Sequence, residues 1–190
     1  MSLLDKIVAA VTPLASEEKR VEARSHAERL SQGNDWLGQI LAHHRQIEDA
    51  FIRALNAAGA EERRRAAENL AAILMAHANA EEAVIYPALV EGSSEAHTTM
   101  AYEEQAAAKI NLAILENLDA TSQEWRDKLE HVQGAVLQHV YQEESTWFPD
   151  LVQNVPAETQ QLLTRRYAEE FGRYNAGGPG NQPTQLPEIA

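Results

Sequence analysis

Apolar residues recur every three or four positions along most of this chain, which is the spacing of helices that bury one face. Glycine and proline gather in a few short stretches between these repeats, where they mark turns. The pattern therefore predicts an all-α protein. The predicted helices cover about residues 16–30, 35–57, 61–89, 95–118, 122–152 and 157–174.

Four of these helices are long and joined by short connections, which predicts an up-down-up-down four-helix bundle with additional N-terminal and C-terminal helices. The helix over 16–30 is dominated by charged residues, so we expect it to lie solvated on the outside. A short amphipathic segment over 3–12 precedes it. The tail has too few apolar residues to form a core and is expected to be disordered. The predicted organisation is an N-terminal helical extension over 1–32, the bundle over 33–152, a C-terminal helix over 153–174 and the tail over 175–190.

The helix predicted over 95–118 is the least regular. Two alternative stripes along this helix could face the core. They are His97, Met100, Glu104, Ala107, Ile114, Leu115 and Leu118, or Ala101, Gln105, Ala108, Leu112 and Leu115. Periodicity does not choose between them. We expect one stripe to face the core and the other to meet an added helix or a partner.

An eleven-residue motif occurs twice, as HANAEEAVIYP from residue 77 and as HVYQEESTWFP from residue 139. Each copy contains a histidine, a glutamate four residues later, a second glutamate, and an aromatic residue before proline. Positions i and i+4 of a helix lie one turn apart on the same face. The spacing therefore predicts paired side chains, and a third pair stands earlier in the chain. The three pairs are His44/Glu48, His77/Glu81 and His139/Glu143.

These pairs lie within otherwise apolar stripes, so the predicted bundle buries several carboxylates. An ionised carboxylate is costly to bury unless a cation or a hydrogen-bonding partner compensates it. A single buried His/Glu pair is more often structural, but the repeated motif favours a metal. Imidazole and carboxylate ligands without thiolates suit iron, manganese or zinc. Because carboxylates bridge ions, this number of ligands predicts a two-metal centre.

The bulk composition restricts the partners. The formal net charge of -13 argues against binding to nucleic acid or to an anionic membrane surface, and no apolar run is long enough to span a membrane. The chain has no cysteine, which rules out thiolate ligands and thiol catalysis. Its first residues lack the layout of a signal peptide, so a cytoplasmic location is expected.

The doubled motif, the His44 segment and the four-helix layout together resemble the hemerythrin-like family, also called HHE cation-binding domains. The resemblance covers residues 35 to about 152. It implies two non-haem iron ions inside the bundle, bridged by carboxylates, that bind dioxygen or related small molecules. The implied ligands are His44, His77, Glu81, His139 and Glu143, with Glu144 as a competitor for the last position.

This sequence departs from the family in its third long helix, where the family normally supplies histidine. Gln105 stands where that histidine is expected. We favour His97 as the ligand from this helix, with Glu104 or a ligand-poor, more open iron as the alternatives. His43 and His131 lie off the stripes of their helices, so a role outside the ligand set is expected for both.

The sequence favours a protein that binds or senses dioxygen, nitric oxide or peroxide, and it shows no separate set of catalytic residues. The alternative is an oxidase or peroxide-removing enzyme that uses the same centre. Iron storage fits the single acidic bundle less well. A metal-free interaction module fits the buried carboxylates less well. The oligomeric state is left open, with a dimer among the options.

Overall fold

The computed structural model describes residues 14–175, and every regular element in this range is helical. The all-α prediction is thus confirmed for the described part of the chain. The segment over 3–12 and the tail from residue 176 lie outside it. The α-helices are α2 (Glu17–Leu30), α3 (Trp36–Asn56), α4 (Gly59–Ala80), α5 (Tyr86–Gly92), α6 (Glu95–Glu116), α7 (Gln123–Gln142), α8 (Phe148–Asn154) and α9 (Ala157–Asn175). Two π-helical turns interrupt them, η1 (Glu81–Ile85) and η2 (Glu143–Trp147).

Polar side chains start several of these helices where the sequence predicted caps. Asp35 accepts a hydrogen bond from the backbone N–H of Gly38 at 2.8 Å, and Ser122 accepts one from that of Trp125 at 3.0 Å. Each bond satisfies an amide that has no partner within its own helix. The long helices therefore begin close to their predicted positions.

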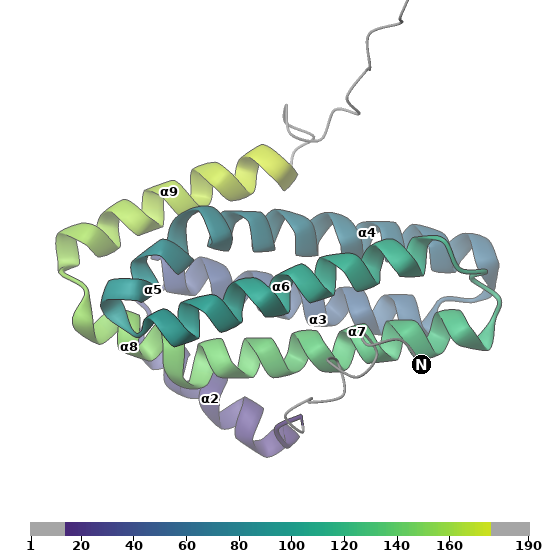
Figure 1. The fold of residues 1–190 in the computed structure, drawn as a ribbon, viewed down its shortest axis with the longest axis horizontal. Coiled ribbons are helices and arrows are strands. Elements are labelled where there is room, and N and C mark those ends of the chain that lie inside the picture. The colour runs from purple at the N-terminus through teal and green to yellow at the C-terminus, as the bar shows by residue number, and fades with distance from the viewer. Residues whose placement is uncertain (1–13, 176–190) are drawn as a thin grey trace, which may run out of the picture.

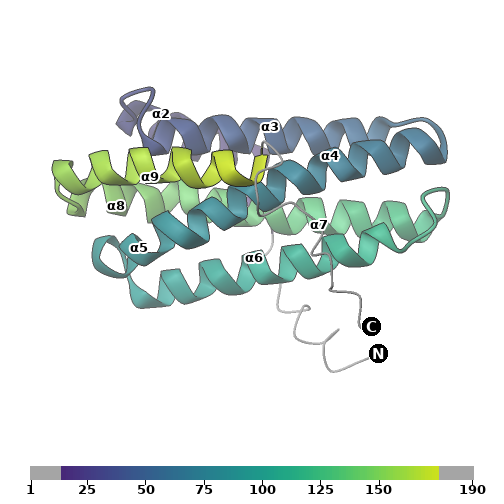
Figure 2. The ribbon, with the colours of Figure 1, turned by 90° about the horizontal axis from the view of Figure 1, so that it is seen from above.

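The four long helices α3, α4, α6 and α7 lie side by side, and successive ones reverse direction through short connections (Figures 1 and 2). Helix α9 packs along α4 and α3, while α2 packs against η2, α3 and α7. The two terminal helices thus cover the end of the molecule at which the motif residues are found.

The interior contains two apolar clusters separated by a polar layer. One cluster is built around Trp36, Tyr86 and Phe148, and the other around Phe51, Trp125 and Leu129. His77, Glu81, His139, Glu143 and Glu144 of the motifs lie between them and are also buried. The buried polar residues are His44, His77, Glu81, Thr98, Gln105, Gln138, His139, Glu143 and Glu144.

Both π-helical turns fall at the same place in the repeated motif, beginning at its first glutamate. Pro87 and Pro149 follow in the first turn of the next helix, where a missing N–H is tolerated. A π-turn inserts one residue into the helical register, and such turns are frequent at functional sites. The sequence predicts a limit or kink at Pro87, and the structure adds a π-turn just before each of the two prolines.

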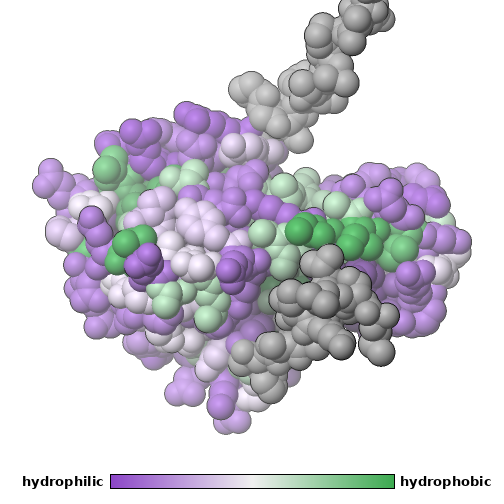
Figure 3. All heavy atoms as spheres, in the orientation of Figure 1, coloured by the Kyte–Doolittle hydropathy of each residue, from purple (hydrophilic) through white to green (hydrophobic). Residues whose placement is uncertain are grey.

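The structure decides which stripe of α6 faces inward. Ala101, Gln105, Leu112 and Leu115 are buried, whereas Met100, Ile110 and Ile114 are exposed. Figure 3 shows apolar side chains on the surface where α6 lies in Figure 1. Within residues 14–175, no helix combines the length and apolar character needed to cross a membrane.

Helices α5 and α8 follow the two π-turns and meet closely at Gly92. A Cβ atom there would lie 2.9 Å from Val155 Cγ2 and would also overlap the side chain of Leu151. Gly92→Ala is therefore expected to lower the free energy of unfolding by about 1–3 kcal/mol, measured by urea denaturation.

The matched control is Gly134→Ala, because a Cβ at Gly134 in α7 meets nothing within 4 Å. Alanine is the better helix former, so this variant should gain up to about 1 kcal/mol. Equal stability of the two variants would contradict the close packing of α5 on α8.

Candidate metal centre

Four side chains from four elements of the fold converge in the polar layer: His44 from α3, His77 from α4, Glu81 from η1 and Glu143 from η2. One ligand atom from each lies within 4.8 Å of those of the other three. All four residues are buried, and both glutamates are fully inaccessible. This spacing is suited to holding one metal ion between the four groups.

Glu143 connects this group to a third histidine. Its Oε2 lies 3.3 Å from His44 Nε2, and its Oε1 lies 3.2 Å from His139 Nε2. Glu81 Oε2 lies 3.2 Å from His77 Nε2. One carboxylate thus has a histidine nitrogen beside each of its oxygens.

Several ligand atoms in this layer lack a partner. His44 Nε2, Glu81 Oε1 and Glu143 Oε2 are buried and find no hydrogen-bond partner among the described residues. A buried polar atom without a partner is costly, so such atoms are rare in folded proteins. Imidazole nitrogen and carboxylate oxygen are both electron-pair donors to a cation. The donor set therefore fits a metal ion such as iron, manganese or zinc.

The other ring nitrogen of each histidine is held from outside the group. His44 Nδ1 lies 2.8 Å from Glu144 Oε1, and His139 Nδ1 lies 2.8 Å from Glu104 Oε2. An ionised carboxylate only accepts hydrogen bonds, so both Nδ1 atoms are assigned as protonated. With Nδ1 protonated, Nε2 is the ring nitrogen whose electron pair a cation could use. Such outer contacts commonly orient metal-binding histidines.

Tyr86 and Gln105 complete the layer on the side of His139. The Tyr86 hydroxyl lies 2.9 Å from Glu143 Oε1, 3.0 Å from His139 Nε2 and 3.3 Å from Glu81 Oε2. Gln105 donates to Glu81 Oε2 at 2.7 Å and also to the Tyr86 hydroxyl. This side therefore contains one histidine, a phenol and an amide.

Without a metal, protons balance the buried charges. Burial opposes the charged form of His44, but the neighbouring carboxylates of Glu143 and Glu144 raise its pKa to about 9. The pKa of His139 is also raised, because the attraction of Glu143 and Glu104 outweighs the effect of burial. Burial and the charge of Glu143 raise the pKa of Glu81. The layer is thus a site where protons and a cation compete.

Glu48, predicted to pair with His44, does not enter the group. Its carboxylate accepts two hydrogen bonds from Arg24 of α2, at 2.7 and 2.9 Å, on the outer side of α3. The prediction is corrected because an arginine from a distant part of the chain already satisfies this carboxylate.

His97, favoured as the ligand from the third long helix, is also placed elsewhere. Its Nδ1 lies 2.7 Å from Ser93 Oγ, and its ring stacks on Trp147. Gln105, two turns further along α6, reaches the layer instead, and Glu104 contacts His139 Nδ1. The helix end at which His97 stands packs against α5 and η2, beyond the polar layer.

Of the remaining candidates, His131 is exposed, as expected for a residue off the stripe. His43 points to α9, where its Nδ1 lies 2.8 Å from the Tyr167 hydroxyl. Glu144 is buried but faces His44 Nδ1 rather than the four-residue group. The sequence analysis missed Tyr86, Tyr167 and Arg24. Only Tyr86 carried a signal, as the aromatic residue that precedes proline in the motif.

Comparisons with known proteins agree with this geometry. A curated relative, "DNA nickase" of Nostoc sp. (strain PCC 7120), is 35% identical over 98 residues, which are 52% of this chain and 27% of that protein. The chain thus covers far less than two thirds of the relative's length. No solved structure matches the chain at a significant level. Residues 37–151, more than half of the chain, match the family model described as "Hemerythrin HHE cation binding domain". The chain therefore belongs to the hemerythrin HHE cation-binding domain family.

Proposed function

We propose that this chain is a non-haem di-iron protein that binds or senses dioxygen or a related small molecule, such as nitric oxide or peroxide. The observation that supports this most strongly is that three of the four grouped residues carry a buried atom without a hydrogen-bond partner among the described residues: His44 Nε2, Glu81 Oε1 and Glu143 Oε2. A cation held by these residues would supply the missing partner. The four long helices would then serve as an up-down-up-down bundle around the centre.

The residues divide between two ion positions. The first would be held by His44, His77, Glu81 and Glu143, whose ligand atoms already lie within 4.8 Å of one another. The second would lie on the other side of Glu143, next to His139 Nε2. Iron in both positions would supply one-electron redox chemistry and a place for a small molecule to bind. Manganese and zinc are the alternatives that the donor set allows.

The alternative function, a di-iron oxidase or peroxide-removing enzyme, rests on the side of His139. There the protein offers Tyr86 and Gln105 where additional imidazoles would complete the coordination of an ion. Fewer strong donors leave coordination positions for a substrate or an oxidant. The same feature also suits binding without turnover.

The proposal includes no nucleic-acid partner. The formal net charge of -13 opposes association with a polyanion. The name "DNA nickase" describes the whole Nostoc protein, and this chain covers only 27% of it.

Iron content and optical spectra of the purified protein test the proposal directly. Two irons per chain, with a spectrum that changes reversibly on adding and removing dioxygen or nitric oxide, would support binding or sensing. Rapid loss of peroxide or formation of an oxidised product would support the enzyme. A protein reconstituted with ferrous iron that retains no metal after gel filtration would contradict both.

Removing a ligand should lower the metal content selectively. His44→Ala and His77→Ala are each expected to cost the first ion, and His139→Ala the second, so iron per chain falls from two towards one. Elemental analysis after reconstitution measures this. His131→Ala is the matched control, because His131 lies on α7 with His139 but is exposed. Equal losses in the His131 and His139 variants would contradict the ligand assignment.

Metal binding should also depend on pH. In the metal-free protein the pKa of His44 is raised to about 9. Below that pH its ring holds a proton that a metal must displace, so affinity is expected to rise with pH by up to about tenfold per unit and to level off above it. Calorimetric titration with zinc, in buffers of different ionisation enthalpy, measures the proton release. Affinity that is constant between about pH 6.5 and 9 would contradict this.

A further inference from the structure

Two side chains from outside residues 37–151 reach the histidines of the first ion position. Arg24 belongs to α2, and Tyr167 belongs to α9. Both helices thus lie outside the segment that matches the family model. Arg24 reaches His44 Nδ1 through the carboxylate of Glu144, and Tyr167 contacts His77 Nδ1 directly.

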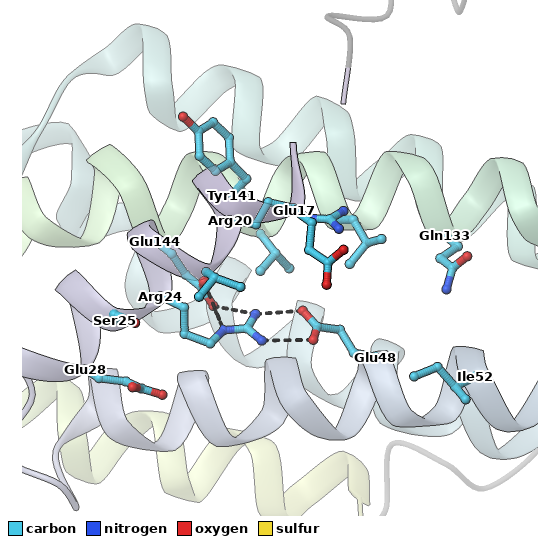
Figure 4. Close-up of a pocket in the computed structure, with 13 residues that line it drawn as sticks. Glu17, Arg20, Arg24, Ser25, Glu28, Glu48, Ile52, Gln133, Tyr141 and Glu144 are labelled. Atoms are coloured by element: carbon cyan, nitrogen blue, oxygen red, sulfur yellow. Dashed lines mark hydrogen bonds and ion pairs between the residues drawn. The ribbon is translucent and has the colours of Figure 1, made fainter. Parts of the chain in front are cut away.

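Arg24 lies between two carboxylates from different helices (Figure 4). Its guanidinium donates to Glu144 through Nε and NH2, at 2.9 to 3.1 Å, and to Glu48 through NH1 and NH2, at 2.7 and 2.9 Å. Only 2% of the Glu144 side chain is exposed, so this carboxylate depends on Arg24 for charge compensation. Burial opposes the charge of Arg24, but hydrogen bonds to Glu48 and Glu144 raise its pKa and keep it cationic.

Glu144 transmits this contact to the centre. The oxygen that accepts from Arg24 at 2.9 Å, Oε1, also lies 2.8 Å from His44 Nδ1. Holding the carboxylate in a fixed place keeps its oxygen beside His44 Nδ1, so that Nε2 faces the centre. The planar guanidinium suits this task because it binds both carboxylates in fixed directions.

Tyr167 of α9 holds the Nδ1 atom of His77, as Glu144 holds that of His44. Its buried hydroxyl lies 3.1 Å from His77 Nδ1 and 2.8 Å from His43 Nδ1. A hydroxyl can donate one hydrogen bond and accept another. Donation to His43 and acceptance from His77 leave His77 Nε2 free for a metal.

We propose that Arg24 and Tyr167 are positioning residues of the metal centre, so that α2 and α9 are parts of the metal site. They set the orientation and the protonated nitrogen of His44 and His77, and thereby the affinity of the first ion. This inference rests on the proposed function, because it presumes that the group binds a metal. It also means that residues 37–151 alone would form an incomplete site.

Arg24 and the two carboxylates that it binds border a groove on the surface. A groove of about 490 Å³ between α2, α3 and α7 is lined by Arg24, Glu48 and Glu144. Figure 4 shows the three side chains together along this groove. A substitution of Arg24 can therefore be solvated from the groove without disturbing the apolar clusters, which makes it a suitable test.

The experiment uses full-length variants, each with a matched control. Arg24→Gln is compared with Arg45→Gln, because Arg45 also joins α3 to α2, through Glu28 at 2.6 Å, but is half exposed and pairs with a surface carboxylate instead of Glu144. Tyr167→Phe is compared with Tyr102→Phe, which removes a hydroxyl that donates to the backbone carbonyl of Glu82. Three quantities are measured: affinity for cobalt(II), the ligand-field spectrum of the cobalt-loaded protein, and thermal unfolding of the metal-free protein.

Arg24→Gln and Tyr167→Phe are each expected to weaken cobalt binding by about 10- to 100-fold and to change the ligand-field spectrum, while both controls remain like wild type. Arg24→Lys should recover part of the affinity. Arg24→Gln should add little to Glu144→Gln if it acts through that carboxylate. Such a set of results would support the positioning role.

Wild-type affinity and spectrum in Arg24→Gln and Tyr167→Phe would overturn the inference. So would weaker binding with an unchanged spectrum and a matching loss of metal-free stability, since that describes a purely structural role. If the wild-type protein itself binds neither cobalt nor iron, the proposed function fails first. The two failures are therefore distinguishable.

Discussion

Two carboxylates, those of Glu81 and Glu143, are completely buried between two apolar clusters, and the surrounding structure has to compensate their charge. Of the residues in these clusters, Tyr86 provides a polar partner to both carboxylates, through its hydroxyl. The available compensation comes from three imidazoles, a phenol and an amide, and in the metal-free state from protons held on His44 and His139. This arrangement leaves three ligand atoms unpartnered, although a core selected only for stability would avoid such atoms.

The repeated motif builds two similar but chemically distinct halves. In both, a π-turn begins at the first glutamate and brings the aromatic residue five positions later to the centre. In the first half this residue is Tyr86, whose hydroxyl contacts both buried carboxylates; in the second it is Phe148, whose ring stacks near that of His44. The second glutamates differ as well. Glu82 pairs with Lys109 at the surface, whereas Glu144 is buried beneath Arg24.

This asymmetry has consequences for chemistry. The side of His44 and His77 offers imidazoles whose outer nitrogens are held by Glu144 and Tyr167. The side of His139 offers a phenol and an amide, which are weaker donors as long as they are neutral. A family fold thus supplies the common frame, while Gln105, Tyr86 and the helices α2 and α9 supply the polar groups that differ between its two sides.

The helices, their caps and the shared layer of His44, His77, Glu81 and Glu143 could be predicted from the sequence, because helical periodicity and the i, i+4 spacing are local properties. Tertiary structure alone decided which neighbouring polar groups joined them. Glu48 has the same spacing from His44 as Glu81 has from His77, yet Arg24 binds it on the outside. Gln105 rather than His97 reaches the layer, because the packing of α6 against its neighbours sets which turn lies level with the glutamates. Arg24 and Glu144 are 120 residues apart, and the energy of a buried carboxylate depends on groups that only the fold brings into contact with it.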